Sequence, residues 1–194
     1  MTYSLRSYFS GLFLVYRKAL SLIELKSGQS LLDLGCGSGT MLFKICESAP
    51  KNAVLYGIDP DPLAIEAAKQ RLKGKNVALK IAYGSDLPFL NESLDFIVST
   101  LAFHHMSPEE KIRTLAEIAR VLKPGGTILI SDLGRPRGVV GSFLYKLSKK
   151  HAYTDKNMDI VEQNMRLNGF LNLEISRTLF WIEHIKAKKR NLNK

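Results

Sequence analysis

A glycine-rich turn that joins a short apolar run to a helical pattern limits the fold of this chain more than any other feature. The segment reads Leu31-Leu32-Asp33-Leu34-Gly35-Cys36-Gly37-Ser38-Gly39-Thr40. Glycines in such a turn adopt positive φ angles and let a ligand come close to the backbone. The segment therefore predicts a strand, a ligand-binding loop and a helix that begins near Met41.

The spacing of the glycines argues against a pyrophosphate ligand. Dinucleotide folds use G-x-G-x-x-G to seat a pyrophosphate at a helix N-terminus. Here the pattern is G-x-G-x-G, with Thr40 where the third glycine would fall and Asp33 just before the turn. Because a carboxylate repels a pyrophosphate, the pattern favours a ligand that carries a cationic group.

Short apolar runs alternate with segments of helical periodicity along most of the chain. Apolar residues in 62–72 and 108–122 recur as one buried helical stripe would require. The predicted strands are Ser30–Leu34, Ala53–Ile58, Val77–Ala82, Leu94–Ser99 and Thr127–Ser131. This alternation is typical of a mainly parallel sheet with helices on both faces. We therefore predict an α/β, Rossmann-like fold.

The alternation changes after Asp132. Residues 139–150 and 159–167 predict two helices, the first of them basic and rich in apolar residues. The closing strands 171–177 and 179–186 are so close in sequence that they must be antiparallel neighbours. The complete prediction is a seven-stranded, mostly parallel sheet with an antiparallel last strand.

Two further carboxylates follow neighbouring predicted strands. Asp59 lies twenty residues beyond Gly39, where a carboxylate can accept hydrogen bonds from ribose hydroxyls. Asp86 lies in Gly84-Ser85-Asp86-Leu87-Pro88-Phe89, after the third strand. Together with Asp33, these acids mark the edge at which α/β sheets bind ligands. The set favours a cofactor that contains adenosine.

In these motifs and their order, the chain resembles the class I S-adenosylmethionine-dependent methyltransferases. The likeness extends from about Gly28 to Lys188 and is greatest to the group of quinone-biosynthesis C-methyltransferases and small lipid or metabolite methyltransferases. It implies S-adenosylmethionine as the cofactor. It also implies a single methyltransferase domain over residues 1–194, with 1–25 and 135–160 as a lid over the substrate.

The resemblance also implies a role for each motif residue. The glycines would pack against the methionine part of the cofactor, with Asp33 near its amino group. Asp59 would hold the ribose, and Asp86 with Leu87 would frame the adenine. The cofactor-binding residues implied in this way are Asp33, Gly35, Cys36, Gly37, Gly39, Asp59, Pro60, Ser85, Asp86, Leu87 and Ser99. No metal site is expected, because the histidines lack further ligands at a recognisable spacing.

Two adjacent histidines follow the fourth predicted strand, at the reacting end of the implied site. His104 and His105 are the candidate catalytic residues, since either could act as a general base for an acceptor that must lose a proton. The alternative is that they cap the strand or orient the loop. Asp132, after the fifth strand, either meets the substrate or caps Gly134, and Cys36 is expected to pack rather than to act as a nucleophile.

The net charge of +10 invites a polyanionic partner, either nucleic acid or an anionic membrane surface. Apolar residues accompany the basic ones in 1–25 and 139–150, which favours a small, apolar or lipid-like methyl acceptor and peripheral contact with an anionic membrane. These segments could equally be lid helices buried against the domain.

Two other functions stay open. A nucleic-acid methyltransferase is supported by charge alone, without an appended RNA-binding module or an Asn-Pro-Pro-Tyr run after the fourth strand. The other is a non-catalytic binding protein that kept the fold, although the intact loop with Asp59 and Asp86 argues against it. The sequence predicts no particular oligomeric state.

The cellular setting follows from the cysteines and the N-terminal segment. Cys36 and Cys46 suggest neither a disulfide framework nor a zinc site, which favours a reducing cytoplasmic setting. The uninterrupted apolar run within residues 1–23 is much shorter than the about 20 residues that a spanning helix needs. It also lacks a clear signal-peptide pattern, so an amphipathic helix is expected there.

Overall fold

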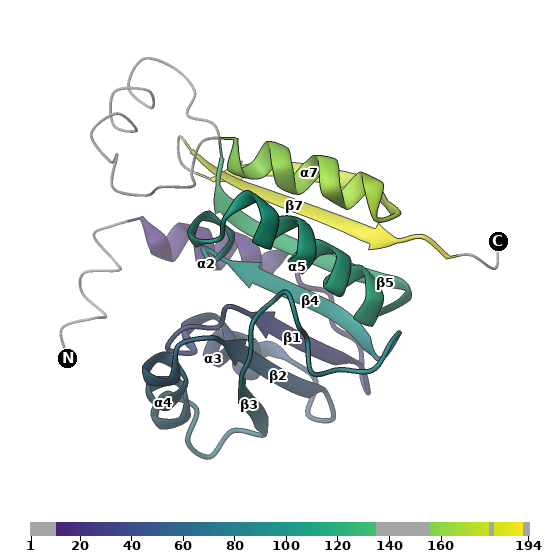
Figure 1. Ribbon diagram of the computed structural model, residues 1–194. Helices are drawn as coiled ribbons and strands as arrows, with labels where there is room; N and C mark the ends of the chain where they lie inside the picture. The colour runs from purple at the N-terminus through teal and green to yellow at the C-terminus, as the bar shows by residue number, and fades with distance from the viewer. Residues whose placement is uncertain (1–10, 135–155, 179–180, 192–194) are drawn as a thin grey trace.

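The computed structural model describes residues 11–134, 156–178 and 181–191, and its strands form one seven-stranded sheet (Figure 1). The strand order is β3-β2-β1-β4-β5-β7-β6. Strands β1 to β5 pair in parallel, and β7 is antiparallel to both β5 and β6. The predicted fold class is therefore confirmed. The strands are β1 (Ser30–Leu34), β2 (Val54–Asp59), β3 (Val77–Ile81), β4 (Leu94–Thr100), β5 (Leu122–Leu133), β6 (Phe170–Thr178) and β7 (Ile182–Lys189).

Helices cover both faces of the sheet, and side chains that alternate along the strands define two apolar layers. Leu31 packs into the layer beneath the N-terminal helices, whereas Leu32 packs into the opposite layer, beneath the later ones. One layer is covered by α2 (Leu12–Ser21), α3 (Thr40–Ser48) and α4 (Pro62–Arg71), and the other by α5 (Pro108–Val121) and α7 (Asn157–Leu167) (Figure 1). Both faces of β1 and β4 are buried, which explains why apolar residues point to both faces of these strands.

The start of α5 follows from its sequence. The Ser107 hydroxyl accepts a hydrogen bond from the Glu110 backbone N–H, and the Glu110 carboxylate accepts one from the Ser107 N–H. Pro108 occupies the first helical turn, where its missing N–H costs nothing. This capping box directs α5 away from the carboxyl ends of the strands, so its first turn borders the cavity described below.

Several element boundaries differ from the predicted ones. Strand β5 begins at Leu122, not at Thr127, because the Lys-Pro-Gly-Gly turn is part of an irregular strand whose pairing with β4 shifts between Leu94 and Phe96. The predicted helix over 139–150 lies outside the described residues. Of the N-terminal segment, Leu12–Ser21 is helical. No helix in the described ranges is long and apolar enough to cross a membrane.

Candidate functional site

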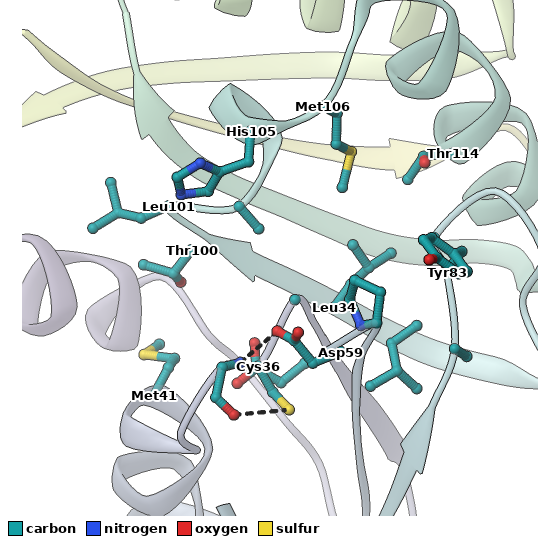
Figure 2. Close-up of a pocket in the computed structure, with 18 of the residues that line it drawn as sticks. Leu34, Cys36, Met41, Asp59, Tyr83, Thr100, Leu101, His105, Met106 and Thr114 are labelled. Carbon is teal, nitrogen blue, oxygen red and sulfur yellow. Dashed lines mark hydrogen bonds between the residues drawn. The ribbon is translucent and has the colours of Figure 1, made fainter. Parts of the chain in front are cut away.

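A cavity of about 450 Å³ opens at the carboxyl ends of β1, β2 and β4 (Figure 2). This is the edge to which the sequence assigned the strand-end acids. Figure 2 shows His105 and Met106 on one side of the cavity and Cys36 with Asp59 on the other. The lining comprises Tyr16, Asp33, Leu34, Gly35, Cys36, Gly37, Ser38, Thr40, Met41, Ile58, Asp59, Pro60, Ala82, Tyr83, Gly84, Ser85, Thr100, Leu101, Ala102, His105, Met106, Glu110 and Thr114.

The glycine-rich loop forms the floor of this cavity. The backbone N–H groups of Gly35 and Cys36 both donate to the Ile58 carbonyl at 2.9 Å, which ties the loop to β2. Gly35, Gly37 and Gly39 all have positive φ angles, at 73°, 52° and 76°. A β-carbon on Gly37 would meet nothing within 4 Å. The loop therefore presents bare backbone to the space where a ligand would lie.

Asp33 is a buried carboxylate beneath that loop. It is only 1% exposed, and its Oδ2 atom finds no hydrogen-bond partner within the described part of the chain. Burial and, to a smaller extent, the charge of Asp59 together raise the pKa of Asp33 to about 7, although a hydrogen bond from the Leu42 backbone acts in the opposite direction. A buried acceptor without a partner is costly, so this atom is suited to a cationic or N–H group of a ligand.

Asp59 holds the glycine loop against β2. Its Oδ2 atom accepts a hydrogen bond from the Gly37 N–H at 2.8 Å, and its Oδ1 atom accepts one from the Asp61 N–H at 3.0 Å. Each carboxylate oxygen has a second lone pair, so both can still accept a ligand hydroxyl. Asp59 and the adjacent Pro60 line the cavity.

The segment 84–89, after β3, lies partly at the cavity and partly in the protein core. Ser85 lines the cavity, but exposed Asp86 and buried Leu87 are not part of its lining. Leu87 instead packs in the core, where its backbone N–H donates to Glu117 and its carbonyl accepts from Arg120. The roles expected of Asp86 and Leu87 at an adenine stay predictions.

Of three other predicted cofactor residues, Cys36 lines the cavity, whereas Ser99 and Gly39 do not. Ser99 is buried, and its hydroxyl donates to the Leu34 carbonyl at 2.8 Å, which ties β4 to β1. Gly39 precedes α3 and packs closely against Ala68 and Leu72. Cys36 lines the cavity, and burial raises the pKa of its thiol, so the neutral form predominates. The expectation that Cys36 packs rather than attacks agrees with this protonation state.

The two histidines occupy different environments. They lie in the short 3-10 helix η1 (Phe103–His105), which follows β4. His104 is buried, and its Nδ1 atom is 2.7 Å from Oδ1 of Asp132. His105 is exposed at the surface of the cavity, and its ring centroid is 3.9 Å from that of His104. Of the pair, His105 is the one that a substrate in the cavity can reach.

Three further cavity residues lie in segments that the resemblance places on the substrate side of the site, namely the expected 1–25 lid and the run after the fourth strand. Tyr16 comes from α2, and burial and the charge of Asp33 raise the pKa of its phenol. Thr100 is 8% exposed, and its hydroxyl oxygen has no partner among the described residues. Its neighbour Leu101 has a φ angle of 57°, which is unusual for a leucine.

The comparisons with known proteins agree with this geometry. A family model described as a methyltransferase domain matches residues 31–126, from β1 through the turn in β5. This range includes the glycine loop and all three strand-end acids. Over this range the chain is similar to methyltransferases, and its fold is that of the class I, S-adenosylmethionine-dependent ones. This similarity supports S-adenosylmethionine, the cofactor that the resemblance implied.

The curated relatives of this chain carry different functional names. It is 35% identical over 127 residues to an uncharacterized methyltransferase of Geobacillus kaustophilus, covering 66% of this chain and 55% of the relative. It is 31% identical over 133 residues to a ubiquinone/menaquinone biosynthesis C-methyltransferase of Geotalea daltonii, covering 66% and 56%. The chain thus spans about half the length of these relatives.

Solved methyltransferase structures match most of this chain in fold. A SAM-dependent methyltransferase from Aquifex aeolicus superposes with a TM-score of 0.71 and 21% identity. The match covers 89% of this chain and 88% of that protein. At this identity the likeness concerns the fold alone.

Proposed function

We propose that this chain transfers a methyl group from S-adenosylmethionine to a small, apolar or lipid-like acceptor. The observation that carries the proposal is the Oδ2 atom of buried Asp33, which has no hydrogen-bond partner among the described residues and lines the same cavity as the open backbone of Gly37. An acid in this position suits the amino group of the cofactor, and the missing β-carbon leaves room for its methionine part. When bound, S-adenosylmethionine supplies a sulfonium methyl with a good leaving group.

The remaining work of the site is positioning. Asp59 holds the loop through Gly37 and keeps lone pairs available for the ribose hydroxyls. Orienting an acceptor in line with the methyl group converts an encounter into an effectively unimolecular step. Where the acceptor must lose a proton, His105 is the base that the cavity offers.

The acceptor side of the cavity supports an apolar substrate. Leu101 and Met106 line it near His105, and Met41 and Tyr83 add apolar surface elsewhere in the cavity (Figure 2). Tyr16 adds a residue of the expected N-terminal lid, whereas most of 135–160 lies outside the described residues. The name of the Geotalea relative makes a quinone precursor the first acceptor to try. Contact with an anionic membrane stays a prediction.

Replacing Asp59 with alanine should weaken cofactor binding about 10- to 100-fold. The change removes the anchor of the Gly37 N–H and the acceptors for the ribose, and hydrogen bonds to a charged group contribute about 1.5–3 kcal/mol. Calorimetric titration with S-adenosylmethionine, S-adenosylhomocysteine and NAD measures the effect. Glu66→Ala, an exposed acid on α4 outside the cavity, is the control. Unchanged affinity in Asp59→Ala, or a preference for NAD, would contradict the proposal.

The acceptor class is tested separately once cofactor binding is established. The wild-type protein is incubated with methyl-labelled S-adenosylmethionine and either a reduced naphthoquinone carrying a prenyl chain, a phospholipid vesicle or an RNA mixture. We expect label in the quinol or lipid fraction. Label in RNA would replace the proposed acceptor by nucleic acid, and cofactor binding without any transfer would favour a binding protein.

A further inference from the structure

A buried carboxylate from β5 organises the turn that follows β4. The Oδ2 atom of Asp132 accepts hydrogen bonds from the backbone N–H groups of Phe103 at 2.7 Å and His104 at 3.4 Å. Its Oδ1 atom accepts from the Leu133 N–H and pairs with Nδ1 of His104 at 2.7 Å. Asp132 is fully buried, so its contacts are shielded from water. One side chain thus fixes both the backbone of η1 and the ring of His104.

The ring of His104 in turn lies against the ring of His105. Their centroids are 3.9 Å apart, and the ring planes are tilted by 43°. His104 is 7% exposed, whereas His105 faces the cavity, where Figure 2 shows its ring beside Leu101. The contacts run without a break from the carboxylate of β5 to a ring at the surface of the ligand cavity.

The surroundings of Asp132 are charged as well as buried. Lys111 of α5 is 0% exposed, and desolvation lowers its pKa while the charge of Asp132 acts in the opposite direction. Buried charges of this kind are costly unless they are paired, and a well-packed apolar group would serve stability better. A carboxylate at this position therefore calls for a reason beyond packing.

We propose that Asp132 is a positioning residue, which acts through His104 to hold His105 as the base for the methyl acceptor. This inference rests on the proposed function. In the step concerned, the acceptor atom forms a bond to the methyl carbon as the carbon–sulfur bond breaks. The electron pair of that bond stays on sulfur, and the acceptor proton passes to the imidazole of His105. Asp132 keeps its own charge throughout and touches neither reactant.

The first test compares turnover in Asp132→Asn with that in Asp95→Asn. Asparagine conserves the volume but has one acceptor oxygen in place of two, so its NH₂ group must face either the N–H groups of η1 or the side of Leu133 and His104 Nδ1. Either orientation disturbs the contacts that hold η1 and the ring of His104. Asp95 is a matched control, because it is a partly buried strand carboxylate that accepts from Ser30 at the opposite edge of the sheet. With the prenylated naphthoquinol, we expect kcat to fall at least tenfold in Asp132→Asn, with KM for S-adenosylmethionine within threefold of wild type.

A second variant guards against misfolding of the first. In His104→Asn the amide can still donate to Asp132, but no ring remains beneath His105. We expect the same loss of kcat with the thermal midpoint preserved. Wild-type kcat in both variants would overturn the proposal.

A readout without turnover separates this inference from the proposed function. Diethyl pyrocarbonate modifies accessible imidazoles, and mass spectrometry follows the modification of His105 with and without S-adenosylhomocysteine. We expect the ligand to slow modification at least fivefold in wild type and Asp95→Asn, and less than twofold in Asp132→Asn. Equal protection in all three proteins would refute the positioning role. Protection without turnover on any acceptor would instead refute the proposed function alone.

Discussion

Asp33→Asn should lower the affinity for S-adenosylhomocysteine by about 100-fold. The partnerless Oδ2 atom is the acceptor that the proposed site offers to the ligand's ammonium group. In the asparagine variant, one oxygen can still accept from the Leu42 backbone, which turns the NH₂ group towards the ligand. A charged hydrogen bond worth about 1.5–3 kcal/mol is then replaced by two opposed donors. Calorimetric titration at pH 7.5 measures the loss.

The same residue should make binding depend on pH. Because the pKa of Asp33 in the free protein is raised to about 7, the carboxyl is mostly protonated below that pH and must lose its proton when a cation binds. Affinity should therefore fall up to tenfold for each unit below pH 7 and level off above it. The Asp33→Asn variant should show no such dependence. Calorimetric titrations of both proteins at about pH 5.5, 6.5 and 7.5 measure the dependence.

Free Asp33→Asn should be more stable than wild type at pH 8. The unfolded chain releases this proton near pH 3.8, whereas the folded chain holds it until about pH 7, so wild-type stability declines as the pH rises between the two. Each unit of separation corresponds to about 1.4 kcal/mol. The variant avoids this loss because its amide does not ionise. Wild-type affinity, or a lower thermal midpoint at pH 8, would contradict the assignment of Asp33.

Gly35→Ala should destabilise the fold by about 3 kcal/mol or more. A β-carbon on Gly35 would overlap that of Ala102, and both residues belong to backbone held by hydrogen bonds or by η1. Overpacking costs about 1–3 kcal/mol. The φ angle of 73° adds about 1–2 kcal/mol for a residue with a side chain. Urea unfolding measures the change, and loss of the cavity should accompany it.

Alanine variants at two other glycines distinguish the effect of the steric overlap from that of the backbone strain. Gly28 and Gly37 also have positive φ angles, but a β-carbon on either would meet nothing within 4 Å. Gly28→Ala and Gly37→Ala should each cost only the strain, about 1–2 kcal/mol. Gly37→Ala should also weaken cofactor binding, because its methyl group would enter the cavity, whereas Gly28→Ala should not. Equal destabilisation of all three variants would show that the contact with Ala102 is unimportant.

The sequence predicted the fold well, because the information for it is local. Buried parallel strands are short segments rich in apolar residues, and such segments can be recognised in the sequence. The turn at Gly35 has a positive φ angle, which glycine adopts far more readily than other residues, so the glycines mark the turn. The capping box at Ser107 likewise lies within four consecutive residues. The boundary of β5 was predicted less well, since its irregular pairing depends on β4.

The order of motifs along the chain was enough to predict the sheet, the ligand loop and the edge at which Asp33 and Asp59 lie. The surroundings of each polar group at that edge, in contrast, depend on the folded structure. His104 and His105 are equivalent in sequence, but Asp132 lies 28 residues from His104 and reaches it across the sheet. The high pKa of Asp33 likewise requires burial and the charge of Asp59, which the fold brings near. Local patterns specify backbone paths, whereas protonation and access depend on neighbours that only folding brings together.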